Sequence, residues 1–134
     1  MTKHQLTPRE LEVLKILWDS SRASVREIRD AMDQSGGDVP YTTVLSLLQQ
    51  MHRKELVGHK KEGKAHVYFP RVRRETAFRS MAGEFVERVF DGAMDEFVMR
   101  AIESQKPDED ELKQLEQAIA EARAKLKSKK KGAK

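Results

Sequence analysis

The fold is decided by residues 40–53, PYTTVLSLLQQMHR, and by the residues that follow them. Apolar side chains recur there at intervals of three and four residues, which predicts a helix with a buried face of Val44, Leu47, Leu48 and Met51. Residues 56–70, LVGHKKEGKAHVYFP, contain two β-prone runs separated by Glu62-Gly63-Lys64, which predicts a β-hairpin. Pro70 ends the second strand or confines it to a sheet edge. The stretch therefore predicts a helix followed directly by a two-stranded wing.

Two shorter helices are predicted before this stretch. The run Thr7-Pro8-Arg9-Glu10 is a capping-box start with proline at the first helical position, and it predicts a helix over about residues 8–19. The run Ser24-Val25-Arg26-Glu27 repeats the capping pattern and opens a short helix with one apolar face, made of Val25, Ile28 and Met32. Residues 35–38, SGGD, then break the chain. This order of three helices and a hairpin predicts a winged helix-turn-helix domain over residues 1–72.

The remainder of the chain predicts helices. Gly92 separates two apolar stripes, and Pro107 followed by four acidic residues marks a new helix start. Leucine, isoleucine and alanine then recur every three or four residues up to Leu126, a short heptad-like seam. We expect residues 73–126 to form a helical dimerisation domain whose contacts are Phe78, Met81, Phe85, Val89, Phe90, Phe97, Leu112, Leu115 and Ile119. Residues 127–134, KSKKKGAK, are expected to be a disordered basic tail.

The predicted fold class is thus mainly α with a small β-hairpin. The composition also excludes several classes of function. The chain has no cysteine, which excludes disulfides and thiolate metal sites. The four histidines are scattered, with at most His59 and His66 facing each other across the hairpin, so we expect no metal and no cofactor. No phosphate loop or nucleophile motif is present, which argues against an enzyme. No apolar run is long enough to span a membrane and no signal peptide precedes the first helix, so we expect a cytoplasmic protein.

The distribution of charge suggests that different parts of the chain have different partners. Residues 1–73 carry a net charge of +4, residues 74–122 one of −7, and residues 123–134 one of +7. A basic first half suits a polyanion, although charged helix surfaces are also common in proteins without one.

The outward face of the helix at 40–53 is the candidate DNA reader. With the apolar face turned inward, the rest is short, polar and almost free of acids, as a helix in the major groove requires. The expected contacts are Tyr41, Thr42, Thr43, Leu45, Ser46, Gln49 and Arg53, with Leu45 as an exposed side chain suited to a thymine methyl. The alternative is a solvated helix surface without a partner.

The predicted wing carries Lys60, Lys61 and Lys64 at and near its tip. Lysines there suit phosphate contacts, which position a protein on DNA without reading sequence. The alternative is that these lysines protect an edge strand from pairing with another chain.

The run from Pro40 to Leu48, with Lys54-Glu55-Leu56-Val57 after the helix, resembles the BlaI/MecI penicillinase-repressor family. The opening around Thr7–Glu10, Leu17-Trp18, Gly63-Lys64-Ala65 and Tyr68-Phe69-Pro70 are similar to that family as well. The resemblance implies a dimeric repressor with an N-terminal winged helix on a palindromic operator and interlocked C-terminal helices. It implies that Thr42, Thr43 and Ser46 lie near bases or phosphates.

The chain departs from the family at two places. Glu55 stands where the family usually has glycine at the end of the recognition helix. In well-known members a membrane-bound sensor protease leads to cleavage of an Asn-Phe bond, which aligns with Arg100-Ala101 here. The motif is absent, which argues against release of DNA by that cleavage.

The sequence therefore predicts a homodimeric, sequence-specific repressor that binds a double-stranded DNA operator, with β-lactam-resistance or related stress genes as the targets that the resemblance implies. Two other readings remain open, a winged helix that docks a protein partner and a regulator that senses a small ligand.

Overall fold

The computed structural model describes residues 6–34, 36 and 38–132. The chain forms two compact units, Met1–Phe85 and Val86–Lys134. We expected the first domain to end at residue 72, whereas the first compact unit ends at Phe85. The difference follows from the packing of Phe78 against Trp18.

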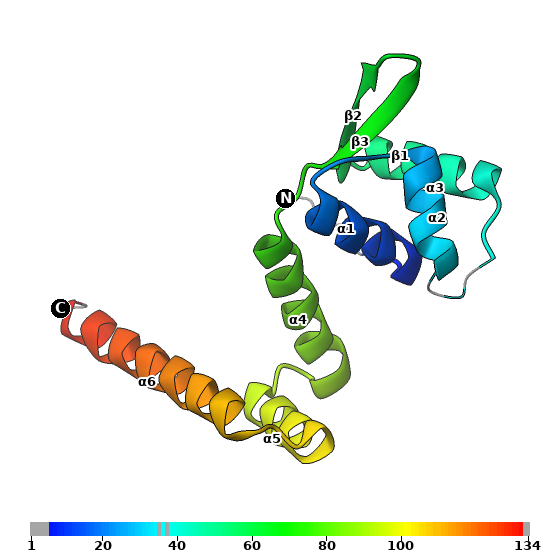
Figure 1. The fold of residues 1–134 in the computed structure, drawn as a ribbon. Coiled ribbons are helices and arrows are strands. Elements are labelled where there is room, and N and C mark those ends of the chain that lie inside the picture. Colours follow the sequence, from blue (N-terminus) through cyan, green and yellow to red (C-terminus); the bar gives the residue numbers. More distant parts are fainter. Residues whose placement is uncertain (1–5, 35, 37, 133–134) are drawn as a thin grey trace. The chain divides into compact units, whose positions relative to one another are not determined.

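Three helices form most of the first unit: α1 (Pro8–Ser20), α2 (Val25–Gln34) and α3 (Tyr41–Arg53) (Figure 1). Both predicted capping boxes are present. The Thr7 backbone N–H donates to Glu10 Oε1 at 3.0 Å, and the Glu10 N–H donates to Thr7 Oγ1 at 3.1 Å. Ser24 and Glu27 exchange the same pair of hydrogen bonds at 2.8 and 3.1 Å. These bonds fix the starts of α1 and α2, because they satisfy backbone N–H groups that have no partner inside the helix.

The wing is part of a three-stranded antiparallel sheet, in the order β1 (Ala23–Ser24), β3 (Ala65–Pro70), β2 (Val57–Glu62). The sequence pattern predicted β2 and β3, while β1 is only two residues long and has no pattern of its own.

Two glycines shape the hairpin. Gly63 in the turn has φ +64°, and a Cβ on Gly58 would lie 2.6 Å from the Phe69 ring. Glycine at residue 58 therefore lets the Phe69 ring cross the strand closely.

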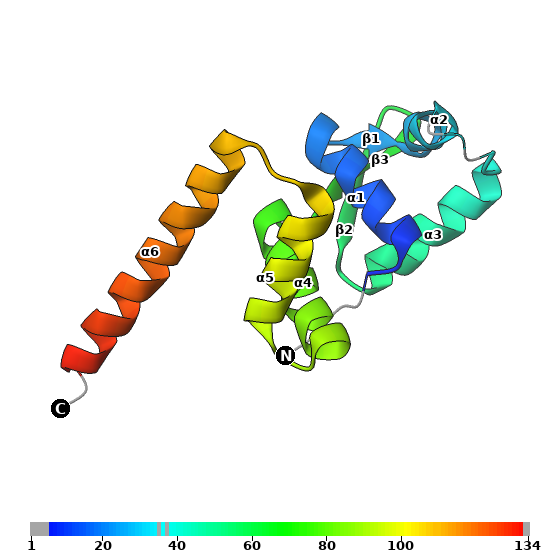
Figure 2. The same ribbon diagram turned by 90° about the horizontal axis from the view of Figure 1, so that it is seen from below.

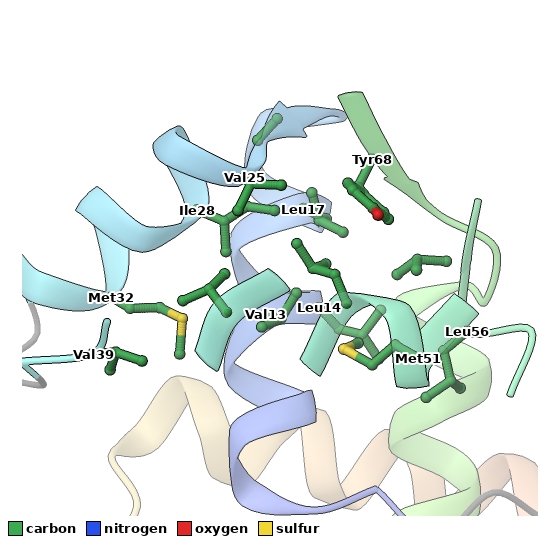
Figure 3. Close-up of a cluster of buried hydrophobic side chains, with 14 residues drawn as sticks. Val13, Leu14, Leu17, Val25, Ile28, Met32, Val39, Met51, Leu56 and Tyr68 are labelled. Atoms are coloured by element: carbon green, nitrogen blue, oxygen red, sulfur yellow. The ribbon is translucent and has the colours of Figure 1, made fainter. Parts of the chain in front are cut away.

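The core of the first unit lies between the three helices and the base of the sheet (Figure 3). The predicted inward faces are confirmed for α2, by Val25, Ile28 and Met32, and for α3, by Val44, Leu48 and Met51. Leu47, which was predicted to be buried, is only partly so. Each fully buried aliphatic side chain contributes roughly 1.5–3 kcal/mol. The core therefore fixes how α3 is rotated about its axis.

An ion pair with a buried carboxylate joins the start of α1 to the end of α3. Glu10 is fully buried; its Oε2 accepts a hydrogen bond from Lys54 Nζ at 2.7 Å, while its Oε1 is held by the Thr7 N–H. Removal of one partner would leave the other without compensation, which is costly for a buried carboxylate. One glutamate thus caps α1 and also holds the last turn of α3 in place.

The chain leaves α3 through a left-handed residue. Glu55 has φ +64°, its N–H donates to the His52 carbonyl at 3.0 Å, and the Leu56 N–H donates to the Met51 carbonyl at 2.9 Å. This is the Schellman arrangement, in which glycine is favoured at the left-handed position. The buried Leu56 and Met51 belong to the same core cluster. The backbone therefore keeps the exit typical of glycine although the side chain is glutamate.

The first turns of α4 (Arg74–Phe90) belong to the winged helix. Ala77 is buried, and the Phe78 ring meets the Trp18 ring edge-on, with 5.7 Å between their centroids. Trp18 Nε1 also donates to the Val72 carbonyl at 2.9 Å. These contacts explain why the first unit extends to Phe85 and not only to residue 72.

The second unit continues with α5 (Met94–Gln105) and α6 (Glu109–Gly132), seen from another side in Figure 2. Gly92, with φ +83°, breaks the chain between α4 and α5 as predicted. Asp108 and Glu111 form a third capping box at the start of α6, with bonds of 3.0 and 2.9 Å. The expectation of a disordered tail is wrong for residues 127–132, which are helical. Lysine is a good helix former and nothing interrupts the helix before Gly132; residues 133–134 lie outside the described residues.

Replacement of Glu55 by glycine should stabilise the first unit. A left-handed backbone costs a residue with a Cβ about 1–2 kcal/mol, and the greater freedom of glycine in the unfolded chain offsets part of this gain. We expect Glu55→Gly to raise the free energy of unfolding by about 1 kcal/mol, measured by urea denaturation with the fluorescence of Trp18, the single tryptophan. Glu55→Ala keeps the Cβ and serves as the control. A glycine variant no more stable than the alanine variant would contradict the strain at this residue.

Candidate nucleic-acid interface

The surface of α3 opposite the core is polar and exposed. The exposed side chains of α3 are Tyr41, Thr42, Thr43, Ser46, Gln49, Gln50, His52 and Arg53. Thr42, Ser46 and Arg53 lie nearly opposite the buried stripe, since residues along a helix turn by about 100° each. No acidic residue occurs in this helix. The structure therefore brings most of the predicted reading face together as one surface.

Leu45 departs from the prediction. It is half-buried and packs against the core, so it is not the exposed apolar side chain that the sequence pattern suggested. Together with Tyr41 and Gln49 it lies on the side of α3 that is turned toward the hairpin, where the three side chains line a groove. The predicted reading face thus divides into an outermost row and a row that borders the wing.

The wing lysines fall on different faces of the hairpin. Lys60 Nζ lies 4.0 Å from Glu62 Oε2, which also accepts a 2.7 Å bond from Arg22. Lys61 is the register partner of His66, and Lys64 is in the turn. Neither Lys61 nor Lys64 takes part in an ion pair within the part of the chain that the structure describes. Two of the three predicted lysines are therefore available for an anionic partner.

A groove of about 760 Å³ runs between α3, the hairpin and the start of α2. Arg26 from α2 and Lys64, His59 and His66 from the hairpin line it, and no carboxylate is among the described residues that do so. Tyr68 lies on the wall of this groove. Its burial is the main cause that raises the pKa of the Tyr68 hydroxyl above that of a free tyrosine, and the nearby Tyr41 raises it further. That hydroxyl therefore stays neutral in this groove, whose charged groups are all basic.

Three histidines form a row beside this groove. The ring centroids of His52 and His59 are 4.6 Å apart, those of His59 and His66 are 5.4 Å apart, and Tyr68 lies 5.2 Å from His59. The hairpin pattern indicated that His59 and His66 could meet, but it missed His52 in the last turn of α3. Among the described residues no three His, Asp or Glu side chains are grouped so that they could hold a metal ion; His4 lies outside them.

The apolar side chains of the second unit are exposed or half-buried over residues 86–130. No side chain among residues 86–130 is buried. Val89, Ile119 and Leu126 are 49%, 52% and 67% exposed, and a hollow of about 510 Å³ between α5 and α6 is lined by Phe97, Ile102 and Leu115 among others.

The predicted dimerisation residues are not all equally available. Phe78 packs on Trp18 within the first unit, and Phe90 packs on Phe97, with 5.6 Å between their centroids. Met81 and Leu112 are half-buried, while Phe85, Val89, Leu115 and Ile119 are exposed. The exposed set further includes Met94, Met99, Ile102 and Leu126, which the predicted interface left out.

The Arg100–Ala101 peptide bond lies within α5. Arg100 forms ion pairs with Glu96 at 3.6 Å and with Glu103 at 2.9 Å on the same helix.

No helix in the described part of the chain is both long enough and apolar enough to cross a membrane.

Known proteins share the pattern of this chain over most of its length. The model of the penicillinase repressor family matches residues 6–121. The penicillinase repressor of Bacillus licheniformis is 25% identical over 117 residues, which cover 87% of this chain and 91% of that protein. The methicillin resistance regulatory protein MecI of Staphylococcus aureus (strain N315) is 23% identical over 112 residues, or 84% of this chain and 90% of that one.

A solved structure is similar to part of the chain as well. The solution structure of the DNA-binding domain of the repressor BlaI superposes with a TM-score of 0.48 and 26% identity, covering 54% of this chain and 87% of that domain. The family match spans both units, from the turn before α1 into α6. The resemblance seen in the sequence is thus confirmed, and the chain belongs to the penicillinase repressor family, the family of BlaI and MecI.

Proposed function

We propose that this protein is a sequence-specific DNA-binding repressor that acts as a homodimer on a palindromic operator. The observation that carries the proposal is the acid-free, exposed face of α3, held outward by the burial of Val44, Leu48 and Met51. A helix that enters the major groove needs short polar side chains near its start and longer donors further along. Thr42 and Ser46 supply the first, and Gln49 and Arg53 the second.

The groove beside α3 supports the same function. Its basic lining suits phosphates, which fix the register of a protein on DNA, while the α3 side chains address base edges. We infer that Lys61 and Lys64 contact the backbone and that Gln49 and Arg53 read bases. The names of the relatives make penicillinase and methicillin-resistance genes the first operators to test.

The second unit supports a homodimer. Three helical segments in which no side chain of residues 86–130 is buried cannot form a stable core alone. A second copy would cover Val89, Leu115 and Ile119 and complete that core. Two recognition helices held in this way would reach successive major grooves roughly 34 Å apart, and two weak half-site contacts would combine into one strong one.

Replacement of Gln49 by alanine should weaken operator binding. A good bidentate contact to a base discriminates by about 1–3 kcal/mol, so we expect about 5- to 150-fold weaker binding to a selected operator and little change on a random duplex. The operator is first enriched from a random duplex pool, and binding is then measured by fluorescence anisotropy at fixed salt. Gln117→Ala on α6 is the matched control. If no duplex is enriched, or if Gln49→Ala binds the operator as the unaltered protein does, the proposed reading face is wrong; a stable complex with a protein would then favour a docking module.

A charge placed in the apolar surface of α6 should separate the subunits. Ile119→Glu would bury a carboxylate in the proposed interface, which is costly without a partner. We expect the unaltered protein to sediment as a dimer, Ile119→Glu to sediment as a monomer, and Gln117→Glu on the same helix to remain a dimer. Sedimentation of the unaltered protein as a monomer at micromolar concentration would contradict the homodimer.

A further inference from the structure

The row of His52, His59 and His66 has no role in the interactions described so far. It begins in the last turn of α3 and crosses the hairpin, where His59 and His66 line the groove. Imidazole is the side chain that changes charge between pH 5 and 8. Three such rings lie beside a groove whose charged lining residues, Arg26 and Lys64, are basic.

The path of the DNA backbone leads through this groove if the proposed function holds. In double-stranded DNA one strand of phosphates separates a major groove from the neighbouring minor groove. A protein with α3 in the major groove and its hairpin over the adjacent backbone must hold that strand of phosphates between the two elements. The space between them is the groove lined by Arg26, Lys64, His59 and His66.

Among the residues that the structure describes, no carboxylate lines the groove beside the row. Cations lie close to it on several elements: Arg26 on α2 and Lys64 in the turn line the same groove, and Lys61 on β2 is the register partner of His66. The hydroxyls of Tyr41 and Tyr68 are the other titratable groups on the groove wall.

Three carboxylates occur on or next to these elements: Glu55, three residues after His52, does not line the groove, and Glu62 and Glu27 have partners elsewhere. Glu62 Oε2 accepts a bond from Arg22 at 2.7 Å, and Glu27 Oε1 accepts the Ser24 N–H at 2.8 Å. Neither lines the groove. Neighbouring imidazolium ions repel each other, and an anion between them removes this penalty. A phosphate from outside the protein is therefore the partner that would favour the protonated row.

We propose that His52, His59 and His66 form a phosphodiester-binding site that takes up protons when DNA enters the groove, so that binding strengthens as pH falls. The inference rests on the proposed DNA-binding function. The complex holds more protons than the free protein, so the association constant rises as pH falls through the range in which imidazole titrates. Because phosphates carry no sequence, the effect is the same on the operator and on a random duplex.

The test is binding of the full-length protein to labelled operator and random duplexes between pH 8 and pH 6 at constant ionic strength. Each proton taken up changes the association constant by up to about tenfold per pH unit. We expect the unaltered protein to bind at least about tenfold more tightly at pH 6 than at pH 8. The triple variant His52→Gln, His59→Gln, His66→Gln should lose most of this gain between pH 8 and pH 6. His4→Gln, outside the described residues, is the matched control.

The outcomes separate the two proposals. Equal pH dependence of the unaltered protein and the triple variant overturns the histidine site while DNA binding stands. Failure of the unaltered protein to bind any duplex at either pH overturns the proposed function itself. The single variant His59→Gln, at the centre of the row, provides a second measurement if the triple variant unfolds, as judged by circular dichroism. Retention of the full pH effect in His59→Gln would also overturn the site.

Discussion

The rotation of α3 about its axis is the constraint on which the rest of the structure depends. Val44, Leu48 and Met51 are completely buried among side chains from α1, α2 and the sheet. A change in register by one residue would turn the helix by about 100° and bring these side chains to the surface. The loss would be several times the roughly 1.5–3 kcal/mol of one side chain. The core therefore decides which side chains of α3 face outward.

Other interactions maintain this orientation from both ends of α3. Lys54 is tied to the buried Glu10, and the left-handed Glu55 turns the chain directly into β2. Only three residues, Lys54, Glu55 and Leu56, consequently separate the end of α3 from the start of the hairpin. The short connection places the basic hairpin beside the reading face and creates the groove between them.

Local sequence patterns predicted the helices and the hairpin but not the tertiary contacts that these elements make. The capping boxes at Thr7 and Ser24 and the turn at Gly63 have short-range causes, so the helices and the hairpin could be predicted. Leu45 was predicted to be exposed because periodicity does not show where the wing lies. β1 exists only because β3 offers it a partner, and the position of His52 beside His59 depends on the same packing. The packing of Phe78 on Trp18 likewise joins residues far apart in the chain, which no local pattern encodes.

The central claim is that two copies of α3 lie in successive major grooves of one duplex. Hydroxyl-radical footprinting of the protein on its enriched operator tests this most directly, because it maps protected backbone at single-nucleotide resolution. We expect two protected blocks with two-fold symmetry, their centres about 10 base pairs or a multiple of one helical turn apart. A single protected block without symmetry, or no protection at saturating protein, would contradict the claim.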